Sequence, residues 1–295
     1  MKKIAIIVFC LTAVTAVFFL TFKYGNRNGN GNGEEYIPAI VPLEYDPEDI
    51  SPVSIPLAPA YHADIPDTGY LKLVNRELYQ SRQTCRSQIV YAWPTVQVST
   101  TAVTIHQTAL NAIAALFADA RYIEEFGSFF ITSGYRSYDR QREIYDNAAD
   151  RAYVLPPGHS EHQLGLAADI LVLGIPMAQM SGTPEAVWLA ENAWQHGLIL
   201  RYPRGTTHIT GVAYEPWHFR YVGRIHAWYM RINDMVLEEY LEYLEEQGGF
   251  TAVLDGVTYH VLYKQVSTGY ILIPVEMEFT MSTSNRGGYV ITAWE

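Results

Sequence analysis

The alternation of apolar and polar residues becomes that of a packed domain from about residue 65. Apolar side chains recur at helical spacing in TIHQTALNAIAALFADARYIEEF (104–126), which predicts a helix. The run SFFIT (128–132) is aromatic and β-branched and is bounded by glycines, which predicts a strand. Helical spacing resumes in residues 137–152, and LAADILVL (166–173) is typical of a buried strand. Helices and strands therefore alternate along the first part of this domain.

The same mixture continues toward the C-terminus. Thr183-Pro184-Glu185 has the pattern of a helix start, and we expect that helix to end near His196, before Gly197. ILRY and HFRYV predict short strands, and residues 224–249 predict one long closing helix whose acidic run forms a solvated face. No regular βαβ repeat is present in this order of elements. The expected class is therefore α+β, with a small mixed or antiparallel sheet flanked by helices.

The last segment has a different pattern. FTAVLDGVTYHVLY (250–263) contains Asp255-Gly256 between alternating β-formers, which is a strong hairpin signal. GYILIPVEMEFTM and GGYVITAW continue the alternation to the end of the chain. Residues 250–295 are therefore predicted to form a small antiparallel β appendix.

The first residues predict an anchor followed by a tether. Lys2 and Lys3 precede an uncharged apolar run, and a helix of roughly 20 such residues can cross a bilayer. No convincing A-x-A cleavage site follows, so we expect residues 1–23 to be a retained single-pass signal anchor, with the remainder extracytoplasmic. Secretion after cleavage is the alternative. Residues 24–62 are Gly/Asn-rich and then Pro-rich, which predicts a flexible linker, and residues 63–249 remain as the main domain.

Composition limits the chemistry. The chain has 295 residues, 49% of them hydrophobic, and a formal net charge of −11, so it can bury a core but lacks the basic patch that nucleic acid requires. Its two cysteines, Cys10 and Cys85, fit neither a disulfide framework nor a thiolate metal site. Any metal would therefore need histidine and carboxylate ligands.

Two short segments supply such ligands. SEHQLGLAAD (160–169) contains His162 and Asp169, and YEPWHFRYVG (214–223) contains Glu215 and His218. A catalytic zinc site needs three protein ligands, an open position and a carboxylate that takes a proton from water. Because Pro follows Glu215, this is not the helical H-E-x-x-H arrangement, and the hypothesis requires a turn at Pro216-Trp217. Glu215 as a solvated loop carboxylate is the alternative, as is His208 as a ligand in place of Asp169.

Four motifs together resemble a known family. SGYRSYDRQ (133–141), SEHQLGLAAD, ENAWQHGLILRYP (191–203) and YEPWHFRYVG are similar in order and spacing to VanY-type zinc D-alanyl-D-alanine carboxypeptidases of the LAS metallopeptidase family. The resemblance extends from LVNR (73–76) through the β-rich tail. It implies a zinc metallocarboxypeptidase that binds one Zn²⁺ per chain.

The resemblance also implies a role for individual residues. His162, Asp169 and His218 match the zinc ligands, and Glu215 matches the general base. Arg136 matches a substrate-binding arginine near the scissile bond, where it would stabilise developing negative charge or bind the terminal carboxylate; a structural ion pair is the third possibility. Four more residues match positions that contact the substrate in this family: Gln141, Ser160, Tyr202 and Trp217.

The function that the resemblance implies is removal of the terminal D-Ala from peptidoglycan pentapeptide precursors. The resemblance also implies a role in glycopeptide (vancomycin) resistance, because such trimming removes the target of the antibiotic; routine wall remodelling by the same reaction is the alternative. An L,D-carboxypeptidase acting on tetrapeptide stems in wall remodelling is the close alternative, and a non-catalytic, zinc-containing wall-binding module is the alternative from another class. The expected partners are peptidoglycan stem peptides and, through the N-terminal helix, the membrane.

Overall fold

A computed structural model describes residues 50–295, apart from 62–63, 83–87, 150, 152–153 and 266–269. The predicted anchor at 1–23 and most of the predicted linker lie outside the described residues. Within the described part of the chain, no helix has both the length and the apolar character needed to cross a membrane.

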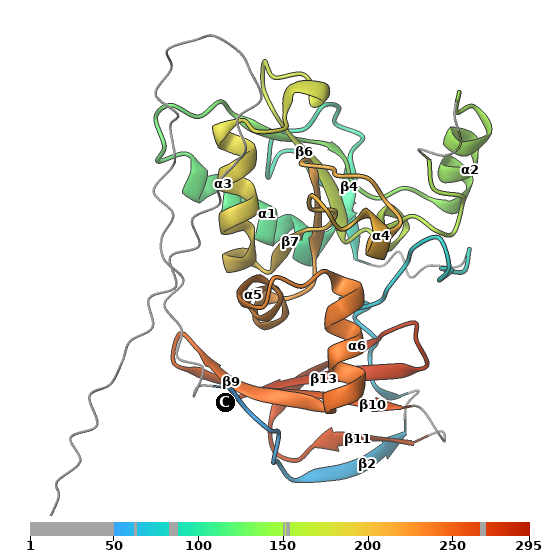
Figure 1. Ribbon diagram of the computed structural model, residues 1–295, viewed down its shortest axis with the longest axis vertical. Helices are drawn as coiled ribbons and strands as arrows, with labels where there is room; N and C mark the ends of the chain where they lie inside the picture. The colour runs from blue at the N-terminus through green and yellow to red at the C-terminus, as the bar shows by residue number, and fades with distance from the viewer. Residues whose placement is uncertain (1–49, 62–63, 83–87, 150, 152–153, 266–269) are drawn as a thin grey trace, which may run out of the picture. The chain divides into compact units, whose positions relative to one another are not determined.

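A small antiparallel sheet organises the main domain (Figure 1). Its strand order is β5-β6-β8-β7, and all three pairings are antiparallel. Every residue of β6 is buried, as the apolar residues on both sides of Asp169 predict. The four strands are β5 (Phe129–Ser133), β6 (Ala167–Val172), β7 (Leu198–Leu200) and β8 (His218–Tyr221).

Helices pack against this sheet and form one hydrophobic core with it. The side chain of His106 caps the first helix, and Thr183 caps the third, which has Pro184 at its first turn as predicted. Both helices contact β7, and their apolar faces join the buried side chains of the sheet. The helices of this part are α1 (Gln107–Ala120), α2 (Tyr138–Asp146), α3 (Pro184–Asn192) and α4 (Thr207–Thr210), with 3₁₀ turns at Glu161–Leu164, Met177–Gln179 and Ala193–His196. A small hairpin joins β3 (Ile89–Tyr91) to β4 (Thr104–His106).

The predicted closing helix over 224–249 is two helices, so that prediction is wrong in its continuity. α5 (Arg224–Ile232) ends before Asp234, whose φ of 52° is left-handed, and α6 (Leu237–Gln247) begins three residues later. Aspartate adopts this backbone conformation more readily than most residues, so it can break a helix whose apolar spacing continues beyond it. The two helices share a second core with the C-terminal strands.

The C-terminal appendix forms a five-stranded antiparallel sheet of order β1-β9-β10-β13-β12. Asp255 and Gly256, with φ of 52° and 76°, make the predicted two-residue hairpin turn. In Figure 1, α6 lies against this sheet, and it contacts β9 and β10. The strands are β1 (Ile50–Ser51), β9 (Gly249–Leu254), β10 (Val257–Gln265), β12 (Glu278–Thr283) and β13 (Gly288–Trp294), and β11 (Tyr270–Pro274) pairs separately with β2 (Leu57–Tyr61).

The appendix therefore includes part of the predicted linker. Residues 50–51 and 57–61 form strands that pair with the tail, so the linker prediction does not hold for these positions. Recurrent prolines exclude a helix, but proline is compatible with edge strands such as β2. The α+β class is confirmed.

Candidate metal centre

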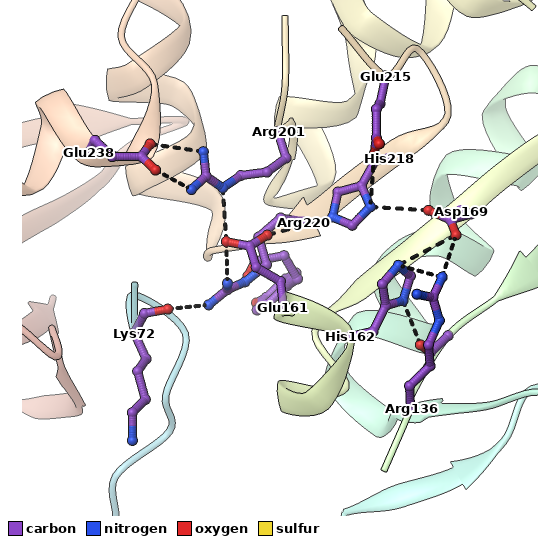
Figure 2. Close-up of polar contacts among 12 residues, drawn as sticks. Lys72, Arg136, Glu161, His162, Asp169, Arg201, Glu215, His218, Arg220 and Glu238 are labelled. Atoms are coloured by element: carbon purple, nitrogen blue, oxygen red, sulfur yellow. Dashed lines mark hydrogen bonds and ion pairs between the residues drawn. The ribbon is translucent and has the colours of Figure 1, made fainter. Parts of the chain in front are cut away.

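The structure brings His162, Asp169 and His218 together, with their potential ligand atoms within 4.8 Å of one another and all three residues buried (Figure 2). His162 lies on the 3₁₀ turn that Gly165 ends with a φ of 74°. Asp169 lies on β6 and is paired in register with His218, the first residue of β8. Antiparallel pairing therefore brings ligands from distant segments side by side.

The orientation of His162 suits a metal ligand. Its Nδ1 lies 2.7 Å from the carbonyl oxygen of Gly134, so Nδ1 carries the proton and donates it to that carbonyl. The lone pair then lies on Nε2, which is 3.4 Å from Asp169 Oδ2. Two imidazole nitrogens and one carboxylate are a ligand set that zinc uses in proteins. The donor set therefore fits a zinc ion.

The carboxylates shift the protonation of this cluster. Burial alone would raise the pKa of Asp169, but His162 and His218 hold it well below its usual value. Burial alone would lower the pKa of His218, but the neighbouring carboxylates of Asp169 and Glu161 raise it to about 9. A ligating ring nitrogen must give up its proton, so a cation that binds here displaces one from His218.

Glu215 approaches the cluster through the turn that the sequence analysis required. Pro216 and Trp217 form that turn, and the backbone N–H of His218 donates to the carbonyl of Glu215 at 3.2 Å. The Glu215 carboxylate lies 3.7 Å from His218 Nδ1, and its side chain is 28% exposed, so water can reach it. Burial raises the pKa of Glu215, which makes this carboxylate a stronger base than a solvated one.

Arg136 lies directly against the ligand residues. Its Nη2 is 3.1 Å from Asp169 Oδ2 and 3.2 Å from His162 Nε2. Its Nη1 donates to Gln141 Oε1 at 3.3 Å. Gln141 is buried and donates in turn to the carbonyl of Leu155, so in this structure it supports the arginine.

The other predicted contact residues lie around the cluster in different ways. Ser160 is buried immediately before the 3₁₀ turn. Tyr202 is also buried, and its ring packs against the imidazole of His218, with 4.9 Å between the ring centroids and 36° between the ring planes. Trp217 is partly buried against the main core. His208, the alternative ligand, is exposed on α4. Among the described residues, the group that could hold a metal ion contains Asp169 and does not contain His208.

Sequence reasoning missed a buried ionic network beside the centre. Arg201 and Arg220 are completely buried and both contact Glu161. Glu238, predicted to lie on the solvated face of a helix, is 8% exposed and accepts two hydrogen bonds from Arg201, so that prediction is wrong. The available signal was an arginine in or directly after each short apolar strand, Arg220 in β8 and Arg201 after β7, because a buried charge needs a partner.

Comparison with known proteins finds a matching family and similar chains. Residues 102–224 match the VanY family profile, described as D-alanyl-D-alanine carboxypeptidase. A D-alanyl-D-alanine carboxypeptidase of Enterococcus faecium is 39% identical over 167 residues, covering 56% of this chain and 54% of the relative. A bifunctional D-Ala-D-Ala dipeptidase and D-Ala-D-Ala carboxypeptidase of Enterococcus gallinarum, VanXYC, is 34% identical over 128 residues, covering 39% of this chain and 67% of the relative.

Two solved structures are also similar. The vancomycin-resistance D,D-dipeptidase VanXYg, solved with a D-Ala-D-Ala phosphinate analogue, matches with a TM-score of 0.69 at 26% identity, covering 82% of this chain and 100% of that chain. The LD-carboxypeptidase LdcB matches with a TM-score of 0.54 at 36% identity, covering 59% of this chain and 86% of that chain.

These matches and the site define the class of the protein. The α+β fold carries a buried His–Asp–His cluster with an adjacent glutamate, as in a metal-dependent hydrolase. The chain belongs to the VanY family of D-alanyl-D-alanine carboxypeptidases. It spans about half the length of the Enterococcus faecium relative.

Proposed function

We propose that this protein is a zinc-dependent D,D-carboxypeptidase that removes the terminal D-Ala from D-Ala-D-Ala-ending peptidoglycan pentapeptides. The observation that carries the proposal is the position of Glu215, a partly exposed carboxylate 3.7 Å from a nitrogen of the His–Asp–His cluster. A structural zinc site usually closes its shell with a fourth protein ligand, whereas a catalytic one keeps a position open beside a base. The wall-binding module is less well supported for that reason.

Each residue has a distinct task in this proposal. His162, Asp169 and His218 hold one zinc ion, which when bound polarises the scissile carbonyl and makes water more acidic. Glu215 accepts the proton of the attacking water and later delivers it to the departing amine of D-Ala. Arg136, which is held by Gln141, binds developing negative charge at the carbonyl oxygen or the terminal carboxylate of the peptide.

An L,D-carboxypeptidase acting on tetrapeptide stems is the second candidate. The similarity to the LD-carboxypeptidase LdcB, at 36% identity, favours it. Both activities use the same metal centre, and they differ in the residue that precedes the scissile bond. The distinction therefore depends on the substrate pocket.

Substrate comparison tests this proposal. Purified full-length protein, with its metal content measured, is incubated separately with pentapeptide and tetrapeptide stems, and released D-Ala is quantified. We expect about one zinc per chain and release from the pentapeptide. Release from the tetrapeptide alone supports the second candidate, and metal binding with no release from either substrate contradicts an enzymatic role.

The location of the enzyme is a further part of the proposal. An N-terminal anchor over residues 1–23 would hold the domain on the outer face of the membrane, where stem peptides are exposed. Trimming D-Ala-D-Ala ends there would remove the target of glycopeptide antibiotics. Membrane fractionation with external protease digestion tests the location, and recovery of the intact protein in the culture medium would contradict it.

A further inference from the structure

Glu161 is a buried carboxylate that no step of the proposed reaction uses. It precedes His162 in sequence, yet it is directed toward the other histidine of the centre, His218 (Figure 2). Glu161 is 1% exposed, and its Oε2 lies 3.6 Å from His218 Nε2. Among the described residues, neither of these two buried atoms has a hydrogen-bond partner. Since buried polar atoms are almost always paired, the natural partner of each is the other.

The opposite nitrogen of His218 faces the metal cluster. His218 Nδ1 lies 3.1 Å from Asp169 Oδ1 and 3.7 Å from Glu215 Oε2. A metal-ligating imidazole keeps a proton on one nitrogen and uses the lone pair of the other. With the proton on Nε2 and directed to Glu161, the lone pair lies on Nδ1, on the side of the cluster.

His162 shows the same arrangement with its nitrogens exchanged. Its Nδ1 donates to the carbonyl of Gly134 at 2.7 Å, which leaves Nε2 facing Asp169. Each histidine therefore has an acceptor behind it, a backbone carbonyl for His162 and a carboxylate for His218. Acceptors of this kind fix the tautomer and ring orientation of metal ligands in proteins.

Glu161 is itself held firmly enough to orient a ring. Its Oε1 accepts from Arg201 Nε at 2.8 Å and forms an ion pair with Arg220 Nη1 at 3.0 Å. Arg201 is fixed by two hydrogen bonds to Glu238, and Arg220 donates to the carbonyls of Gly69, Tyr70 and Lys72. Two arginines and two glutamates balance in charge, so Glu161 stays ionised although it is buried.

We propose that Glu161 is a positioning residue for His218, accepting the hydrogen bond of its Nε2–H and thereby presenting Nδ1 to the metal. The proposal rests on the zinc site of the proposed function. Removing an acceptor of this kind typically costs 10- to 100-fold in metal affinity.

Paired variants test this role. Glu161→Gln replaces two acceptor oxygens with one acceptor oxygen and one NH₂ donor. In either orientation of the amide, its NH₂ group faces another donor, either the N–H of His218 or an arginine. Glu238→Gln is the matched control, because it alters a carboxylate of the same buried network that does not contact His218. Full-length proteins are titrated with zinc against a competing chelator, and thermal unfolding of the metal-free forms is recorded in parallel.

We expect Glu161→Gln to weaken zinc binding 10- to 100-fold and Glu238→Gln to stay within about 3-fold of wild type. Unchanged affinity in Glu161→Gln, or equal loss in both variants, overturns the proposal, since equal loss indicates a general effect on the fold. If wild type binds no zinc, the proposed function fails first. If wild type binds zinc and releases D-Ala, but Glu161→Gln binds zinc as tightly as wild type, only the proposed role of Glu161 is contradicted.

A measurement on unmodified protein covers the case in which Glu161→Gln does not fold. ¹⁵N-histidine NMR of the zinc-loaded full-length chain reports which ring nitrogens carry protons. We expect a bound proton on Nε2 of His218 and on Nδ1 of His162. A proton-free Nε2 in His218 overturns the proposal.

Discussion

Removing Arg201 should destabilise the fold more than any exposed arginine would. Its guanidinium is fully buried and makes three hydrogen bonds, one to Glu161 at 2.8 Å and two to Glu238 at 2.6 and 2.9 Å. Arg201→Met keeps a similar length of side chain and removes the charge. Glu161 then keeps Arg220 and His218 as partners, and the carboxylate of Glu238 loses both of its bonds to Arg201.

The expected cost follows from this pairing. Breaking a buried ion pair from one side typically costs about 3–5 kcal/mol, because it leaves an uncompensated charge. Glu161 retains Arg220, and Glu238 lies close enough to the surface to reach water, so we expect about 3 kcal/mol. For a domain of this size that corresponds to a decrease of roughly 6–12 °C in melting temperature.

The loss should also depend on pH. Burial would raise the pKa of Glu161, but Arg201 and Arg220 hold it well below its usual value. The stability that this ionised carboxylate contributes is therefore present above about pH 4.3, the ordinary glutamate pKa, and is lost at lower pH. The difference between Arg201→Met and wild type should shrink as the pH falls below that value.

Unfolding of the metal-free proteins by urea, followed by circular dichroism, measures this effect. Arg82→Met is the matched control, because Arg82 pairs with Asp139 at the surface, where the two side chains are 62% and 45% exposed. The control should unfold like wild type. A loss below about 1 kcal/mol in Arg201→Met, or one that does not change between pH 7 and pH 3, would refute the reasoning.

Three further predictions concern other buried groups. Burial lowers the pKa of His226 to about 3, so wild type should lose about 1.4 kcal/mol of stability per pH unit between about pH 6.5 and about pH 3, and His226→Gln should flatten that slope in urea titrations. Gly134→Ala adds a Cβ that collides with a neighbouring backbone carbonyl and disturbs the acceptor of His162, so chelator competition should show about 10-fold weaker zinc binding; wild-type affinity would contradict this. Gln141→Ala releases Arg136 from its support, so kcat/KM for the pentapeptide should fall about 10-fold with zinc content unchanged; full activity would show that the contact is dispensable.

Local signals in the sequence predicted much of the fold. The cap of α3, the buried strand β6 and the Asp255-Gly256 turn depend on neighbouring residues, and such features can be read from a short window. The end of α5 was missed because the apolar spacing continues past Asp234. The pairing of residues 50–61 with the tail was missed because strand pairing between distant segments leaves no local pattern.

The candidate site was predictable to a similar extent. The spacing of His162 and Asp169, and the turn required at Pro216, came from the two motifs. The register that sets Asp169 opposite His218 depends on the pairing of two distant strands, so neither motif predicts it. Glu161 and its arginines were missed because a charged residue in a short segment is most simply interpreted as solvated, and only the folded chain shows that their charges cancel in the core.

The most direct test of the proposed function is D-Ala release from pentapeptide stems by zinc-loaded wild type and Glu215→Gln. The substitution preserves the size of a side chain that is not one of the three proposed ligands, so zinc content should stay at the wild-type level. Removing a general base typically costs 10²- to 10⁴-fold in rate, and we expect kcat to fall within that range. Equal zinc content with kcat within about 3-fold of wild type would contradict the assignment of Glu215 as the base.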